Sequence, residues 1–219
     1  MNYSFLKNTN LFHGISEDEI KYALKCLNAR QKTYKKNEII FNAGNTVNEI
    51  GLVLSGSVNV VMNLYWGDSR ILGHIEKGQV FAENYAAVVG KELICDITAC
   101  EDCEILFLNL RSVMTTCQRC CSFHQQLIYN LLKISAQKNL NLLGRIMHTA
   151  SRSIRSRIIS YLSEQSMING STHFKIPFDR KQLADYLGVD RSALSNELSK
   201  MQKEGLITFK KNDFVLNDL

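Results

Sequence analysis

Four polar residues follow one another closely within segment 178–207, FDRKQLADYLGVDRSALSNELSKMQKEGLI: Arg191, Ser192, Ser195 and Asn196. If the stretch between Asp190 and Gly205 is a helix, they lie on its solvent side, because the apolar residues of the segment occupy the opposite face. Arginine can donate two hydrogen bonds to guanine, and asparagine can pair in the same way with adenine. These residue types at this spacing predict a surface that contacts the edges of DNA bases.

Cations surround this face, and they suit contacts with phosphate, which position a protein on DNA without specifying a sequence. The candidates are Arg180, Lys200, Lys210 and Lys211. Charge is also uneven along the chain: the net charge is +5, and residues 144–219 contain 12 Lys and Arg against 8 Asp and Glu. A basic end favours a polyanionic partner. The alternative is a solvated face with no partner.

Two helices and a turn must position the polar face. Asp179 is a good N-cap for the first helix, with Gln182 at its third position. Gly188 predicts the end of that helix, since glycine adopts the left-handed backbone without a Cβ penalty. Asp190 then caps the second helix, and Gly205 ends it.

Two short strands are predicted after the second helix, LITFK and DFVLND, joined by a turn at Lys211–Asn212. Together the two helices and the strands form a winged helix-turn-helix, whose second helix enters the major groove. The alternative is a module of the same shape that binds protein instead of DNA. A further amphipathic helix precedes them over SIRSRIISYLSEQ, with Ile154, Ile158, Ile159 and Leu162 predicted to point inward.

The first half of the chain has a different pattern. Ser16 and Glu19 predict a capped helix over 16–28. Short runs rich in Val, Ile and Phe then alternate with glycines from about residue 30 to 112, which indicates an antiparallel sandwich or barrel. The glycines, which include Gly51 and Gly73, are predicted to mark turns and tight corners.

A long helix is predicted from about residue 122 to 147, where no proline interrupts a stripe with helical spacing. Its apolar positions are Leu127, Ile128, Leu131, Leu132, Ile134, Leu142, Leu143 and Ile146. At about 1.5 Å per residue the helix is near 40 Å long, more than one small barrel covers. The stripe therefore predicts dimerisation through a second copy. Packing within one monomer is the alternative.

The chain shows no apolar core of signal-peptide length and no stretch of roughly 20 apolar residues, so we expect a cytoplasmic protein that does not enter the membrane. The seven cysteines are then expected to be reduced. No nucleophile–base pairing, phosphate-loop glycine pattern or paired carboxylate motif indicates an enzyme. We predict three parts: a barrel at 1–116, a dimerisation helix at 117–147 and the winged helix-turn-helix at 148–219.

Taken together, the two halves resemble the Crp/Fnr family of bacterial transcription regulators over nearly the whole chain. The likeness lies in RSRIISYL at 155–162 and in 180–207, and in the barrel in AGN at 43–45, LSGSV at 54–58 and KGQVFAE at 77–83. It implies an α+β fold: an N-terminal β-roll of the double-stranded β-helix or jelly-roll type, similar to cyclic-nucleotide-binding domains, then a dimer helix and a winged helix-turn-helix. It also implies a homodimer that binds a palindromic operator in double-stranded DNA, with RNA polymerase as a further candidate partner.

The resemblance does not extend to the effector. Members that bind cyclic AMP carry an Arg-Ser or Arg-Thr pair that clamps the cyclic phosphate, and the matching positions here are Leu93 and Ile94. Without its arginine, a buried phosphate loses a charge-assisted bond. The sequence therefore argues against cyclic AMP and leaves the effector unknown.

Other positions of the effector site are retained or replaced. Glu83 matches the residue that contacts the ribose, while Ala82 replaces the usual glycine. Lys138 and Asn139 match helix positions that contact the base in nucleotide-binding members. With Leu93 and Ile94, they define the expected effector pocket.

Cysteine spacing leaves three interpretations open. Cys100-x-x-Cys103 and Cys117-x-x-Cys120-Cys121 fit structural cysteines, a thiol redox sensor or a metal site. The iron–sulfur members of the family use several N-terminal cysteines, whereas this chain has only Cys26 near its start, so that site is absent. A haem sensor with His74 or His124 as ligand is a further alternative.

Overall fold

The computed structural model describes residues 1–65, 67, 69–114 and 122–217. The described chain divides into two compact units, Met1–Gln137 and Lys138–Leu219. The boundary falls inside one continuous helix, α5 (Ser122–Thr149). The three-part division expected from the sequence, with a segment for the helix alone, stays a prediction.

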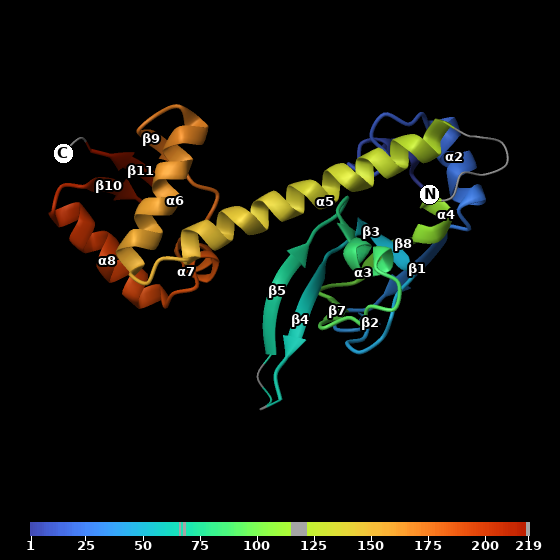
Figure 1. Cartoon of the computed structure of the whole chain (residues 1–219), viewed down its shortest axis with the longest axis horizontal. Helices are drawn as coiled ribbons and strands as arrows, with labels where there is room; N and C mark the ends of the chain where they lie inside the picture. Colours follow the sequence, from blue (N-terminus) through green and yellow to red (C-terminus); the bar gives the residue numbers. More distant parts are fainter. Residues whose placement is uncertain (66, 68, 115–121, 218–219) are drawn as a thin grey trace. The chain divides into compact units, whose positions relative to one another are not determined.

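Two four-stranded antiparallel sheets make up most of the N-terminal unit (Figure 1). The first has the order β1-β8-β3-β6 and consists of β1 (Arg30–Tyr34), β8 (Cys103–Asn109), β3 (Glu49–Ser55) and β6 (Val80–Phe81). The second has the order β2-β7-β4-β5 and consists of β2 (Ile39–Phe41), β7 (Asp96–Ala99), β4 (Val58–Asn63) and β5 (Ser69–Ile75). Apart from the β4–β5 hairpin, neighbouring strands in these lists are not consecutive in the sequence, as expected for a β-roll.

Strand β3 is buried on both faces, so its side chains divide between two cores. Leu52 belongs to the core beneath the helices, and Val53 to the interior of the barrel. Gly51 faces the barrel interior, and a Cβ there would lie 2.1 Å from the Phe81 ring. The prediction that Gly51 and Gly73 mark turns was wrong: both lie within strands, and at Gly51 the absent side chain makes room for an aromatic ring.

Helices cover the outer face of the first sheet. These are α1 (Tyr3–Lys7), α2 (Glu17–Cys26), α4 (Leu110–Met114) and the first half of α5. The predicted capping box of α2 is confirmed: the Ser16 hydroxyl accepts the Glu19 amide at 3.3 Å, and Glu19 accepts the Ser16 amide at 3.0 Å. Asn130 of α5 fixes the N-terminal segment by donating to the carbonyls of Leu11 and His13, each at 2.8 Å.

Helix α5 changes character along its length. In its first turns Leu127 and Leu131 are buried in the core of the N-terminal unit. Leu132 is already 66% accessible, and beyond Ile134, which still packs against that core, the apolar side chains are exposed, with Ile146 62% accessible. The second half of the predicted stripe therefore has no cover within the described part of this chain.

The C-terminal unit packs three helices and a small sheet around one core (Figure 1). Its elements are α6 (Ile154–Asn169), β9 (His173–Lys175), α7 (Arg180–Leu187), α8 (Arg191–Lys203), β10 (Ile207–Lys210) and β11 (Asp213–Leu216). The sheet has the order β10-β11-β9, and the sequence did not predict β9.

One core position in α6 was predicted wrongly. Ile159 was expected inside but is 45% exposed, and Tyr161 is buried instead. The Tyr161 ring packs against Phe178 and Tyr186, with ring centroids 6.0 and 5.5 Å away. An aromatic cluster contributed by other elements thus decides which face of α6 turns inward.

The α+β class is confirmed, with its antiparallel β-roll, its long helix and its winged helix-turn-helix. Within the described ranges, none of the helices has the length and apolarity needed to cross a bilayer.

Candidate nucleic-acid interface

Helix α7 begins and ends as the sequence predicts. The Asp179 carboxylate accepts the Gln182 amide at 2.8 Å, and the Gln182 side chain accepts the Asp179 amide at the same distance. This reciprocal cap satisfies donors that have no partner inside the helix. Gly188 ends α7 in the left-handed conformation, with φ of 64°.

The second helix, α8, starts from Asp190. Its carboxylate accepts the amides of Ser192 at 2.8 Å and Ala193 at 2.9 Å, and also the Ser192 hydroxyl. These hydrogen bonds hold the pKa of Asp190 below its ordinary value, the Ser192 side chain having the largest effect. The carboxylate is therefore ionised at neutral pH and suits the positive end of the helix dipole.

The polar face of α8 is accessible, as its sequence predicts. Arg191, Ser192 and Asn196 are exposed, and Ser195 is half-buried. The Ser195 hydroxyl donates to the Arg191 carbonyl at 2.9 Å, and Ser192 bonds to the cap. Arg191 and Asn196 are thus the long polar side chains at this face, while the serines already bond to their own helix.

The opposite face of α8 packs into the core of the C-terminal unit. Leu194, Leu198 and Met201 are buried there. A contact that the sequence did not predict also fixes the helix: Arg155 of α6 donates to Glu197 at 2.6 Å and to both Glu204 oxygens, at 2.7 and 2.9 Å. Glu197 and Glu204 lie 42 and 49 residues beyond Arg155, so no local spacing in the sequence predicts these ion pairs.

The wing forms as predicted from β10 and β11, with Lys211 at the turn in a left-handed conformation, φ 58°. Lys200, Lys210 and Lys211 are exposed. Arg180 has an additional role. Its guanidinium lies 4.9 Å from the Phe209 ring centroid and donates to the Lys211 carbonyl at 3.2 Å.

Burial against the wing lowers the pKa of Arg180 from its ordinary value, although a guanidinium remains charged at neutral pH. A cleft of about 450 Å³ lies beside this contact, between the start of α7 and the wing turn. Lining it are Pro177, Asp179, Arg180, Gln182, Lys211 and Asn212. Arg180 therefore joins α7 to the wing, and its contact with phosphate stays a prediction.

The residues of the expected effector pocket lie in both units. Glu83 opens α3 (Glu83–Ala87) and is only 6% exposed. Leu93 is buried and its backbone pairs with the loop at 44–45, whereas Ile94 is largely exposed. Lys138 and Asn139 lie on α5 in the C-terminal unit, half-buried and exposed respectively. Near Glu83, Asn84 accepts the Ser135 hydroxyl of α5 at 2.9 Å.

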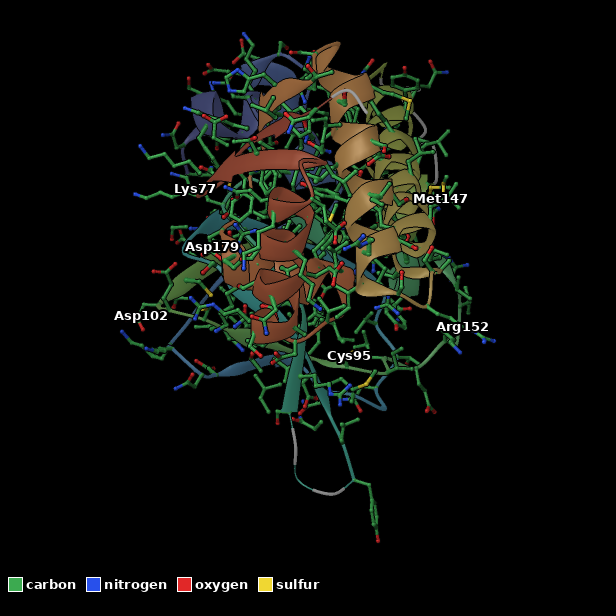
Figure 2. All side chains as sticks on the ribbon, turned by 90° about the vertical axis from the view of Figure 1, so that its left-hand side faces the viewer. Lys77, Cys95, Asp102, Met147, Arg152 and Asp179 are labelled. Atoms are coloured by element: carbon green, nitrogen blue, oxygen red, sulfur yellow. The ribbon has the colours of Figure 1, made fainter. Side chains whose placement is uncertain are left out.

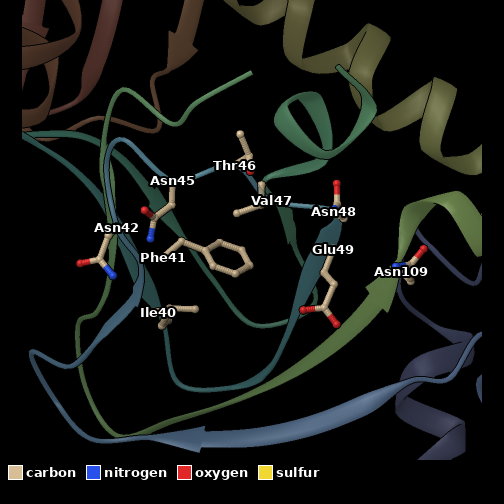
Figure 3. A pocket seen from close by; sticks show the side chains of 9 residues that line it. All are labelled: Ile40, Phe41, Asn42, Asn45, Thr46, Val47, Asn48, Glu49 and Asn109. Atoms are coloured by element: carbon tan, nitrogen blue, oxygen red, sulfur yellow. The ribbon is translucent and has the colours of Figure 1, made fainter. Parts of the chain in front are cut away.

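A polar cleft of about 370 Å³ opens elsewhere on the barrel (Figure 3). Its lining comprises Ile40, Phe41, Asn42, Asn45, Thr46, Val47, Asn48, Glu49 and Asn109. The Phe41 ring lies among these lining residues, and it packs in T-shaped geometry against Phe81 and Phe107 of the barrel interior. None of the five residues of the expected pocket contributes to this lining.

The described cysteines do not form an activated pair. Cys103 is buried and Cys100 half-buried, on either side of the β7–β8 turn. Burial raises the pKa of Cys103, and that of Cys95 (labelled in Figure 2), above the ordinary value. Reactive thiols have lowered values instead. Cys117 and Cys120 lie outside the described residues.

The two histidines considered as haem ligands differ in environment. His74 is exposed, and its Nδ1 lies 2.7 Å from Asn59 Oδ1. His124 is buried and stacks on Phe123, and its Nδ1 has no hydrogen-bond partner among the described groups. Among the residues that the structure describes, no group of three or more His, Cys, Asp or Glu side chains is placed to hold a metal ion.

Comparison with known proteins matches both units to described families. The cyclic nucleotide-binding domain family matches residues 31–120, and the Crp-like helix-turn-helix domain family matches residues 156–219. A structure of the c-di-GMP-responsive global regulator CLP from Xanthomonas campestris has the same fold, with a TM-score of 0.59 and 17% identity over 93% of this chain and all of that one.

Sequence relatives cover both units together. The cyclic AMP receptor protein of Thermus thermophilus is 24% identical over 202 residues, covering 92% of this chain and 89% of that protein. The anaerobic regulatory protein of Haemophilus influenzae is 22% identical over 202 residues, covering 87% of this chain and 74% of that protein. With its sensor-type barrel and Crp-like helix-turn-helix, the chain belongs to the Crp/Fnr family of transcription regulators.

Proposed function

We propose that the chain binds double-stranded DNA through the exposed N-terminal face of α8, with Arg191 and Asn196 as the main base-reading residues. The observation that carries this is the division of α8: its polar side chains are exposed around a capped N-terminus, while its apolar face is buried. Arginine and asparagine make bidentate contacts with guanine and adenine. Ser192 and Ser195 are assigned a lesser part in base contact, because their hydroxyls already donate hydrogen bonds within the helix.

Contacts with phosphate are assigned to the cations around this face. Lys200, Lys210 and Lys211 are exposed on α8 and the wing. Arg180, at the start of α7, lines the cleft beside the wing turn together with Lys211. Such contacts set register and orientation and give affinity that falls with salt.

The exposed stripe on α5 supports a homodimer. Leu132 and Met147 are 66% and 63% accessible (Met147 is labelled in Figure 2), and Leu140, Leu143 and Ile146 are also exposed. A helix with such a seam is stabilised by packing against a copy of itself. Two copies then present two recognition helices to the half-sites of a palindromic operator, one DNA turn apart.

The effector of the barrel is not cyclic AMP in this proposal. A relative is named for that ligand, but the residues here do not fit it. The positions matched to the phosphate clamp are Leu93 and Ile94, which cannot donate a hydrogen bond from their side chains. Glu83 remains a candidate contact for another ligand. We place this regulator in the cytoplasm, without catalytic activity, and with RNA polymerase as a candidate partner.

Selection of binding sites from random DNA duplexes by the full-length protein tests the proposal. We expect inverted repeats with half-sites about 34 Å apart, and affinity that falls steeply as salt rises. Arg191→Ala should cost about 1–3 kcal/mol on the selected site and relax one base position. Arg70→Ala, which removes an exposed arginine from β5, is the matched control and should leave the selected sequence unchanged. Equal binding of all duplexes by the wild type would overturn the assignment of α8.

A further inference from the structure

The end of α7 contacts the last turns of α5 through an arginine. Arg145 of α5 donates to the carbonyls of Asp185 and Tyr186, each at 3.1 Å. The last carbonyls of a helix have few partners inside it, and they carry its negative dipole end. A guanidinium from another helix therefore completes the end of α7.

A histidine one turn further along α5 makes a second contact with the same residue. His148 is buried, and its Nδ1 lies 2.9 Å from the Tyr186 hydroxyl. Its Nε2 lies 3.1 Å from the Glu164 carboxylate of α6. The imidazole thus bridges three helices, and Tyr186 is bonded to α5 through both its backbone and its side chain.

The turn that follows Tyr186 is fixed from the same side. Arg157 of α6 donates to the carbonyls of Leu187 and Gly188, at 2.9 and 3.1 Å. The same guanidinium donates at 2.7 Å to Ser151, in the link between α5 and α6. Since Gly188 connects α7 to α8, whatever fixes this turn also fixes the start of the recognition helix.

On the α5 side the contact combines these hydrogen bonds with the packing of one ring, the His148 imidazole, 5.5 Å from Tyr161 and 5.8 Å from Tyr186 between ring centroids. The neighbouring apolar residues Ile146 and Met147 are more than 60% exposed, and the apolar core of the C-terminal unit is built from residues beyond α5. Burial of apolar surface is non-directional, whereas hydrogen bonds demand defined distances and angles. A contact made by Arg145 and His148 therefore specifies the angle between α5 and α7.

We propose that Arg145, His148 and Tyr186 are positioning residues for DNA recognition. They fix the helix-turn-helix to the end of α5, so that the direction of α5 determines where α8 lies against DNA. This inference rests on the proposed DNA binding and adds to it the residues that align the two recognition helices of a dimer. Base contacts need that alignment, whereas contacts with phosphate along any sequence tolerate its loss.

Tyr186→Phe in the full-length protein tests the inference, because it removes only the hydroxyl that bonds His148. Tyr161→Phe is the matched control: it lies in the same aromatic cluster, and its buried hydroxyl has no partner among the described residues. Affinity is measured for the selected inverted repeat and for a random duplex of equal length, at a temperature where each variant is fully folded by circular dichroism. We expect Tyr186→Phe to weaken binding to the repeat by about five- to tenfold, the loss of one hydrogen bond, and to leave the random duplex unchanged.

Arg145→Lys is a second variant that keeps the charge but loses the two-donor fork. It should lower the ratio of the affinity for the inverted repeat to the affinity for the random duplex. Tyr161→Phe should leave the ratio at the wild-type value. A ratio unchanged in both Tyr186→Phe and Arg145→Lys, with only a lower melting temperature, would show a merely structural role and overturn the inference. A wild type that does not distinguish the repeat from the random duplex would overturn the proposed DNA binding, and the inference with it.

Discussion

The helices that carry the two predicted sites, α7 and α8 in the C-terminal unit and α3 in the N-terminal unit, differ in how they start. In the C-terminal unit the side chains of Ser153, Asp179 and Asp190 each cap a helix. In the N-terminal unit α3, which carries Glu83, starts from Ala82 in the left-handed conformation, and among the described residues no side chain caps it. The DNA-binding unit is therefore fixed by hydrogen bonds between near neighbours, whereas the expected effector segment depends on its tertiary contacts.

The cores differ in the same sense. One cluster holds the C-terminal unit together, whereas β3 and β8 of the N-terminal unit separate two clusters. A strand buried on both faces leaves few positions free to carry polar ligands.

The largest effect on stability should come from truncating a buried side chain in the core of either unit. Leu198 in α8 and Leu106 in β8 are both fully buried, and replacement of each by alanine should cost about 2–5 kcal/mol. Because the chain divides into two compact units, calorimetry should show two transitions. Leu198→Ala should lower only that of the C-terminal unit, by about 10 °C or more, and Leu106→Ala only the other.

A single transition lowered equally by both substitutions would show that the units unfold together. In that case the contrast between a locally fixed and a tertiary-dependent unit would not hold for stability. Val89→Ala is the control for an exposed apolar side chain and should change neither transition, since Val89 is 94% accessible and lies outside the α5 stripe.

A matched pair of left-handed positions gives an intermediate effect. Gly188 and Ala82 have φ of 64° and 63°. Gly188→Ala should destabilise the C-terminal unit by about 1–2 kcal/mol, because an added Cβ meets no atom closer than 3.7 Å and only the backbone strain remains. Ala82→Gly relieves the same strain and should stabilise the N-terminal unit by up to about 1 kcal/mol, since the flexible unfolded chain offsets part of the gain. Urea titrations measure the change in the free energy of unfolding for each variant. Changes of the same sign in both would contradict the assignment of left-handed strain to these two positions.

The smallest effect is electrostatic and depends on pH. Hydrogen bonds lower the pKa of Asp190 in the C-terminal unit, and the Lys35 side chain does the same for Asp102 in the N-terminal unit. A carboxylate with a depressed pKa stabilises the fold above its unfolded value, and this stabilisation is lost as pH falls through the folded value. Wild type should therefore exceed Asp190→Asn and Asp102→Asn in stability from about pH 5 to 8, and the differences should shrink as the pH falls below about 4, through the depressed folded pKa values. Differences that grow in acid would contradict both shifts.

Local pattern was sufficient to predict the helix-turn-helix. Each boundary depends on residues within three or four positions: Asp179 with Gln182, Gly188 at the turn, and Asp190 with the next amides. The capping box at Ser16 was found for the same reason. Caps and left-handed glycines act through neighbouring backbone atoms, so the sequence alone records them.

Contacts across long separations were not predictable. Nothing near Arg155 indicates its pairing with Glu197, and nothing near Arg180 indicates that its guanidinium turns to the wing. Ile159 and Tyr161 exchange the expected positions because an aromatic cluster from α7 and its preceding loop selects the larger ring. Gly51 was misassigned because the ring that needs its space lies 30 residues further along the chain.

By itself the sequence determined the fold class, the helix caps of the helix-turn-helix and the accessible polar face of α8. Only the tertiary structure decided that Tyr186 bonds to Arg145 and His148, that Arg180 joins α7 to the wing and that Ala82 is left-handed. The physical reason is range. Propensity, capping and hydrophobic period act within a few residues, whereas the angle between two helices is set by hydrogen bonds between side chains and carbonyls about 40 residues apart.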